Sequence, residues 1–212
     1  LNNIAKASAA NPRLEELLDA SLEQVLSNMG ADADVICIVD VDKEEHSAAC
    51  YRGLSPEFVR TIQKAKLRDD PVAHEVVRTG RTVFWAKLPG DPVTLEVAHP
   101  GRLEIYDKVF EDLTVLEKAK REGIMSGISA PLKSDGEVNG ILAVATRKER
   151  RFSKADQDFL ESIGGQLGMA IRNAILYEHS QLQNRELSAL LAIGKVVTSS
   201  FDLDELLDAS LD

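Results

Sequence analysis

Two nearly identical nonapeptides lie near opposite ends of this 212-residue chain. Residues 14–22 read LEELLDASL and residues 203–211 read LDELLDASL, an offset of 189 positions. At that offset, residues 1–23 and 190–212 are identical at 11 of 23 positions without a gap. Two unrelated Leu-rich helices would coincide only locally, whereas this match continues upstream of the helix. We therefore expect one complete unit followed by the opening of a second copy, as in a tandem array.

The first 85 residues alternate helix signals with strand signals. Three segments begin with Pro after a capping residue, which is typical of a helix N-terminus. Short runs rich in apolar residues, two of them separated by a polar turn, indicate strands. The pattern predicts helices over 12–29, 56–66 and 71–79 and strands over 34–41, 46–52 and 82–85.

Residues 86–122 form a long connection whose first half is broken by three prolines. Apolar residues then recur at helical spacing up to Gly123, which predicts a helix in the second half. Those residues are Leu103, Tyr106, Phe110, Leu113 and Leu116. A connection of this length inside a compact domain is usually functional or mobile.

The C-terminal third begins with a hairpin signal, Asp135-Gly136, between apolar runs at 128–133 and 138–146. Ser153 and Asp156 then form a capping box, and no Pro follows residue 153. One helix is therefore expected from 154 to about 198, with a new helix starting near Asp202. Hairpins dominate the order of elements, so we predict an α+β fold in which an antiparallel sheet carries helices on both faces.

Composition narrows the classes of partner. The formal net charge is -10, which argues against nucleic acid as a partner because such affinity comes largely from Lys and Arg. No apolar run reaches the ~20 residues of a membrane span, and no secretory signal is visible. Two cysteines do not make a disulfide framework, so a reducing, cytoplasmic compartment is expected.

Five segments, in this order and at this spacing, resemble the GAF domain pattern. They are HEVVRTGRTVF at 74–84, SAPL at 129–132, GEVNGILAV at 136–144, RFSKADQDFL at 151–160 and AIRNAILYE at 170–178. The resemblance implies a GAF/PAS-like antiparallel sheet of about six strands, with the terminal helices on one face and a small-molecule pocket on the other. It also implies a long C-terminal signalling helix.

The resemblance divides the chain into four parts. Residues 1–11 would end a preceding linker helix, 12–178 would form a GAF domain, 179–202 a signalling-helix linker, and 203–212 the start of a second GAF domain. GAF domains bind cyclic nucleotides, bilins, haem or small metabolites, and many only dimerise. The fold therefore leaves the function open.

If the pocket is used, a few aromatic and histidine side chains from the middle of the chain are expected to line it. These ligand-pocket candidates are His74, Phe84, Trp85, His99, Tyr106 and Phe110. In the simpler alternative, Trp85, Tyr106 and Phe110 only seal the long connection onto the sheet.

No metal or bound cofactor is expected. His74 and His99 lack the further ligands that a metal site needs. Cys37 and Cys50 are expected to be buried thiols on neighbouring strands and not a redox pair. No cysteine lies in the long connection and the cyclic-nucleotide signature is missing. We therefore expect no haem or bilin, and the identity of a ligand is unknown.

A helix longer than its domain buries its outer apolar stripe only against a partner. We therefore expect a homodimer through the terminal helices, with Ile171, Ile175, Leu182, Leu187 and Leu190 on the dimer and signalling helix. The alternative is a single unpartnered helix.

Three functions remain open. The first is a non-enzymatic, small-molecule-sensing module of a multidomain signal-transduction protein, such as a sensor histidine kinase of a two-component system. The second is a ligand-free dimerisation spacer. The third is a GAF-type methionine sulfoxide reductase.

Overall fold

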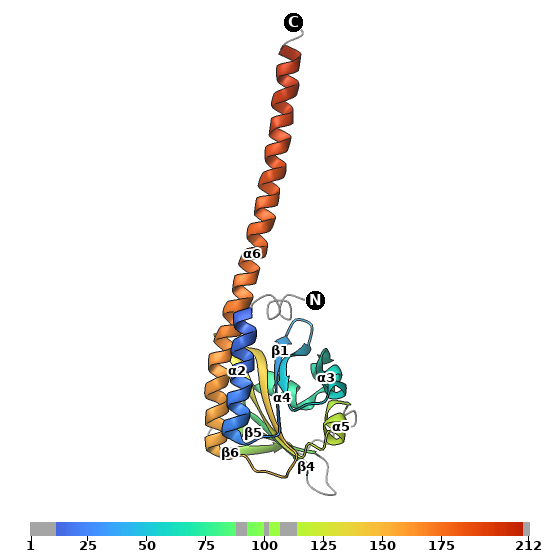
Figure 1. Ribbon diagram of the computed structural model, residues 1–212, viewed down its shortest axis with the longest axis vertical. Helices are drawn as coiled ribbons and strands as arrows, with labels where there is room; N and C mark the ends of the chain where they lie inside the picture. The colour runs from blue at the N-terminus through green and yellow to red at the C-terminus, as the bar shows by residue number, and fades with distance from the viewer. Residues whose placement is uncertain (1–11, 88–92, 100–101, 107–113, 210–212) are drawn as a thin grey trace. The chain divides into compact units, whose positions relative to one another are not determined.

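The computed structural model describes residues 12–87, 93–99, 102–106 and 114–209 (Figure 1). The chain divides into two units, Leu1–Ala174 and Ile175–Asp212. The first unit holds the sheet and its helices. The second consists, where described, of the continuation of one helix.

Five helices and eight strands are described. The helices are α2 (Pro12–Met29), α3 (Pro56–Ile62), α4 (Pro71–Thr79), α5 (Thr114–Arg121) and α6 (Lys154–Ala209), with a 3-10 turn η1 (Leu67–Asp69). The strands are β1 (Ala33–Asp40), β2 (Glu45–Arg52), β3 (Ala65–Lys66), β4 (Val83–Lys87), β5 (Val93–His99), β6 (Arg102–Tyr106), β7 (Ser126–Ser134) and β8 (Glu137–Thr146).

The strands form one sheet in the order β3-β2-β1-β8-β7-β4-β5-β6, and every described pairing is antiparallel. The central hairpin β7–β8 turns at Asp135 and Gly136, whose φ angles of 52° and 84° match the Asp-Gly signal for a two-residue turn. The predicted α+β fold with an antiparallel sheet is confirmed.

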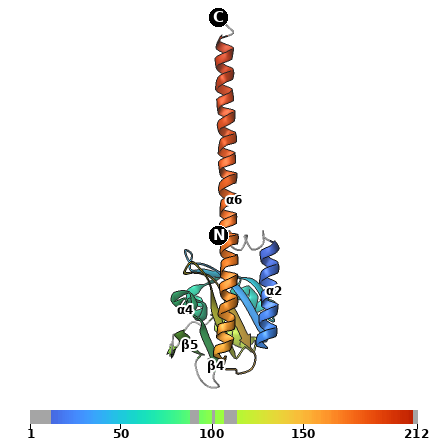
Figure 2. The same ribbon diagram turned by 90° about the vertical axis from the view of Figure 1, so that its left-hand side faces the viewer.

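Helices cover both faces of the sheet, as predicted. Figures 1 and 2 show α2 and the first part of α6 on one side and α4 on the other. Side chains alternate between faces along each strand. In β1, Val35, Cys37 and Val39 belong to the core on the α3–α4–α5 side, while Ile36 points to the α2 side, where Leu18 and Leu22 are fully buried.

Helix α6 lies very close to strand β7. A Cβ added at Gly164 would come within 2.9 Å of the Pro131 carbonyl oxygen, and one at Gly168 within 2.3 Å of the Lys133 carbonyl oxygen. Only glycines permit such an approach of a helix backbone to a strand backbone.

Three expectations about the elements were wrong. The sheet has eight strands and not about six, because β5 and β6 form within the long connection and β3 adds a short edge strand. Residues 103–106 belong to β6 and not to a helix, since Arg102–Tyr106 alternates polar and apolar residues and pairs with β5. The helix expected over 56–66 ends at Ile62.

A fourth difference concerns the C-terminus. Helix α6 runs without a break to Ala209, so the expected boundary between 198 and 202 is absent from the described residues. The segment contains no Pro or Gly between 195 and 209, and nothing in it forces the helix to stop. None of the described helices is both long and apolar enough to span a membrane.

Candidate functional site

A cavity of about 90 Å³ lies on the face of the sheet opposite α2. Its walls come from both the sheet and the helices α3, α4 and α5, and most of them are apolar. The apolar lining includes Val35, Leu54, Phe58, Ile62, Val72, Ala73, Trp85, Val115, Ala119, Ile124, Ile141, Ala143 and Ala145. One water needs roughly 10–15 Å³ of such space, so the cavity has room for a small organic molecule.

His46 and Asp70 form an ion pair at one end of this cavity. His46 is paired with Val39 across β1 and β2, which turns its side chain toward the cavity face. Its Nε2 lies 3.3 Å from Asp70 Oδ2. The other carboxylate oxygen, Asp70 Oδ1, accepts the backbone N–H groups of Val72 and Ala73 at 3.1 and 3.0 Å and so caps α4.

The electrostatics of this pair favour the charged form of both groups. Burial alone lowers the pKa of His46, but the interactions with the Asp70 carboxylate and with Cys37 outweigh it, and the pKa of His46 is raised. Burial alone raises the pKa of Asp70, but His46 and the two backbone N–H groups hold it below its usual value. The pair is therefore a positive and a negative charge that cancel.

Ser129 supplies the polar group at the other end of the cavity. It lies on β7 and pairs with Ala143 on β8, and its side chain is 1% exposed. No described residue forms a hydrogen bond with its hydroxyl. Buried polar atoms are normally hydrogen-bonded, so this hydroxyl is available to a bound molecule.

The structure does not bring the six ligand-pocket candidates together in one place. Trp85 lines the cavity, whereas Phe84, paired with Ile128, points to the opposite face. His74 is exposed on α4 and does not line it. His99 lies on β5, paired with Arg102, and Tyr106 lies on β6, paired with Leu95. Phe110 lies outside the described residues.

Sequence reasoning missed His46, Asp70 and Ser129 as site residues. In the sequence, Asp70 precedes Pro71 and signals only a helix cap, and in the structure the cap and the ion pair use different oxygens of the same carboxylate. A histidine and a serine at inward-facing strand positions were the available signals. These signals can be recognised only when the strand register is known, because the register decides which side chains face the cavity.

The other face of the sheet carries a second buried polar group. Asp34 is 1% exposed and lies directly across from Arg52, whose Nη2 is 2.7 Å from Asp19 Oδ2 on α2. Burial raises the pKa of Asp34 to about 7, although Arg52 opposes the shift. Asp34 also borders the cavity, but the strand alternation places its side chain on the α2 side.

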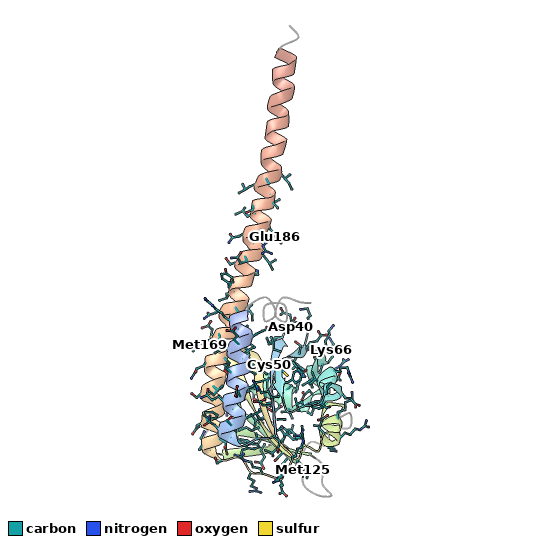
Figure 3. The ribbon with its side chains drawn as sticks, viewed as in Figure 1. Asp40, Cys50, Lys66, Met125, Met169 and Glu186 are labelled. Carbon is teal, nitrogen blue, oxygen red and sulfur yellow. The ribbon has the colours of Figure 1, made fainter. Side chains whose placement is uncertain are left out.

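The two cysteines lie on neighbouring strands but face opposite sides of the sheet. Cys37 lines the cavity, and Cys50 Sγ lies 3.7 Å from Asp19 Oδ1 beside α2 (Figure 3). Both are free, and Cys50 is only half-buried, contrary to expectation. Burial raises the pKa of the Cys50 thiol to about 11. Within the described part of the chain, no group of three or more His, Cys, Asp or Glu residues could hold a metal ion.

The residues expected on the dimer helix fall into two groups. Ile171 is 1% exposed, so it packs inside its own domain and is not available to a partner. Ile175 is half-buried. Leu182, Leu187 and Leu190 are exposed, as are Leu191 and Ile193. Met169 also lies on the outward side of α6 (Figure 3).

Solved structures share this fold at low sequence identity. The phycocyanobilin-bound GAF domain from a cyanobacterial phytochrome aligns with a TM-score of 0.60 and 18% identity over 84% of this chain and 98% of that one. A domain of a putative two-component sensor histidine kinase from Sinorhizobium meliloti 1021 gives 0.53 and 20%, over 80% and 96%.

A free methionine-R-sulfoxide reductase from Neisseria meningitidis gives a TM-score of 0.55 and 16% identity, over 82% of this chain and 86% of that one. No curated protein sequence matches the chain. The family model described as GAF domain matches residues 12–172, which is more than half of the sequence. This chain therefore belongs to the GAF domain family.

Proposed function

We propose that this GAF domain is a non-catalytic sensory module that binds a small molecule in the cavity and passes its occupancy on through α6. The observation that carries the proposal is a buried polar atom without a described partner, Ser129 Oγ, in a largely apolar cavity. A buried hydroxyl costs about 1–3 kcal/mol when it has no partner, so a bound molecule that pairs with it would gain that free energy.

Strand β7 supplies a route from the cavity to the helix. Ser129 points into the cavity from one side of β7, and Gly164 and Gly168 of α6 lie against the Pro131 and Lys133 backbone of the same strand. Because that contact is backbone to backbone, a small displacement of β7 has no flexible side chain to absorb it. Helix α6 then continues from the domain to Ala209. Ligand binding would shift the population of helix positions.

The structural neighbours are consistent with this role, since one of them is a domain of a putative two-component sensor histidine kinase. We propose the same context here: a module of a multidomain signalling protein that forms a homodimer through its terminal helices. A reductase that closes a disulfide between Cys37 and Cys50 is disfavoured, because the two thiols are on opposite faces of the sheet.

A thermal-shift screen with a library of small metabolites tests the proposal. A ligand that binds only the folded state must raise the melting temperature, and by more at higher concentration. The hits should lose most of their effect in Ala73→Leu, which fills the cavity from α4, and keep it in Ser162→Ala, an exposed position on α6. Hits that raise the melting temperature of Ala73→Leu as much as that of the wild type would contradict binding in the cavity. A complete lack of hits would favour the alternative of a ligand-free dimerisation spacer.

A further inference from the structure

The charges that line the cavity already balance. Apart from Asp34, whose carboxyl lies on the other face of the sheet with Arg52, the charged side chains among its described lining residues are His46 and Asp70. Nε2 of His46 and Oδ2 of Asp70 are 3.3 Å apart. A buried ion is tolerated only with a counter-charge and further hydrogen bonds. Because these two charges balance each other, the described lining offers a charged ligand no further counter-charge.

The free polar atom of Ser129 is remote from that ion pair. In the sheet order, β7 is separated from β2 by β8 and β1. Three inter-strand spacings of about 4.8 Å place the two backbones roughly 14 Å apart. A small ligand that reaches Ser129 therefore meets a neutral hydroxyl in apolar surroundings and not the charges of His46 and Asp70.

Trp85 provides a flat apolar surface beside Ser129. Trp85 pairs with Gly127 and Val83 pairs with Ser129, so Trp85 and Ser129 are diagonal neighbours on the cavity face. A Cβ at Gly127 would lie only 2.4 Å from Trp85 Cε2, which shows that the indole lies against the β7 backbone. Small residues, Ala143 and Ala145, line the cavity nearby on β8 and leave space in front of the ring.

We infer that the ligand is an uncharged molecule about the size of a single ring, which packs on Trp85 and places one carbonyl or hydroxyl group on Ser129 Oγ. This inference rests on the proposed function, because it names the ligand class of the same cavity. Ser129 would donate to a carbonyl or exchange a hydrogen bond with a hydroxyl.

Three probes of nearly equal shape test the charge: benzamide (neutral), benzoate (negative) and benzamidinium (positive), each titrated at pH 7.5. Trp85 is the only tryptophan of the chain, so its fluorescence reports occupancy of this part of the cavity directly. We expect a saturable change with benzamide, and at least about tenfold weaker binding of benzoate and benzamidinium because each would bury an unpaired charge.

Ser129→Ala tests the polar contact, with Ser162→Ala as the matched control. The first variant should raise the benzamide Kd about fivefold, the net effect of one neutral hydrogen bond, and the control should leave it unchanged. Ser129→Ala removes a buried oxygen that no described residue pairs with, so folding is not at risk.

The outcomes separate this inference from the proposed function. Benzoate or benzamidinium binding as tightly as benzamide would overturn the uncharged class while leaving a ligand-binding cavity intact. An unchanged Kd in Ser129→Ala would overturn the placement of the polar group. Failure of all three probes to bind would overturn the inference, whereas the metabolite screen with Ala73→Leu decides the proposed function independently.

Discussion

Gly168 of α6 lies directly against Lys133 of β7: a Cβ at position 168 would be 2.3 Å from the Lys133 carbonyl oxygen and 2.5 Å from its backbone nitrogen. This contact joins the helix that leaves the domain to the strand that carries Ser129. The proposed route of the signal depends on it, and it can be tested by adding a single methyl group.

Gly168→Ala should destabilise the domain by about 1–3 kcal/mol, because the added methyl must push α6 away from β7. Gly165→Ala is the matched control, since a Cβ there meets nothing within 4 Å. That variant should stabilise by up to about 1 kcal/mol, the ordinary gain of Ala over Gly in a helix. Urea unfolding measures both. Equal effects of the two substitutions would show that the α6–β7 contact is not tight.

The His46–Asp70 pair should make stability depend on pH above neutrality. The folded pKa of His46 is raised above its unfolded value near 6.5, so its contribution is complete below pH 6.5 and declines as pH rises toward the folded pKa. The pKa of Asp70 is lowered, so its contribution is lost only under acid conditions, below its usual value of 3.8.

Asp70→Asn keeps an oxygen for the α4 cap but removes the negative charge. We expect it to destabilise by about 3 kcal/mol or more near pH 6, because His46 loses the partner of its buried charge and must give up its proton to stay buried. The decline of stability above pH 7 should disappear, since buried His46 is then neutral in the folded state. Urea unfolding between pH 5.5 and 9 gives both quantities. A variant that retained the wild-type pH profile would show that Asp70 does not control the charge of His46.

Asp34 should act in a separate pH range. Its folded pKa of about 7 lies above the unfolded value of 3.8, so the stability it contributes is complete below pH 3.8 and is lost as pH rises through 7. The slope reaches at most about 1.4 kcal/mol per pH unit. Asp34→Asn should flatten the profile between pH 4 and 6.5, where His46 does not contribute. A profile as steep as that of the wild type would rule out Asp34 as its source.

Exposed leucines of the second unit should hold the proposed dimer together. The double variant Leu187→Gln, Leu190→Gln should be monomeric in light scattering at concentrations where the wild type is dimeric, with unchanged thermal stability of the domain. Arg185→Gln with Glu186→Gln, which changes exposed polar neighbours, is the control (Figure 3). A monomeric wild type at high concentration would refute the dimer.

Local signals were sufficient for much of the fold. Pro12, Pro56 and Pro71 begin helices as predicted, and Asp135-Gly136 turns the central hairpin. The sequence did not predict strands β5 and β6. Three prolines in and around the first strand argue against regular structure there, and the apolar spacing from Leu103 also fits a helix. Local periodicity does not include the pairing with β4 that turns this segment into strands.

The site was harder to predict than the fold. Trp85 lines the cavity, whereas its neighbour Phe84 faces the other way because adjacent strand residues alternate. His46 and Asp70 are 24 positions apart in sequence and meet only through the packing of α4 on the sheet. No rule of sequence spacing connects the two residues, so the ion pair could be found only from the three-dimensional structure.

The central claim is that a molecule in the cavity changes α6 through β7, and hydrogen–deuterium exchange measures this most directly. With a saturating ligand from the thermal screen, we predict slower amide exchange in Ser126–Ser134 and in α6 around Gly164 and Gly168, and no such change in Gly168→Ala at equal occupancy. Protection confined to the cavity walls, with exchange in α6 identical in the bound and free protein, would contradict the claim.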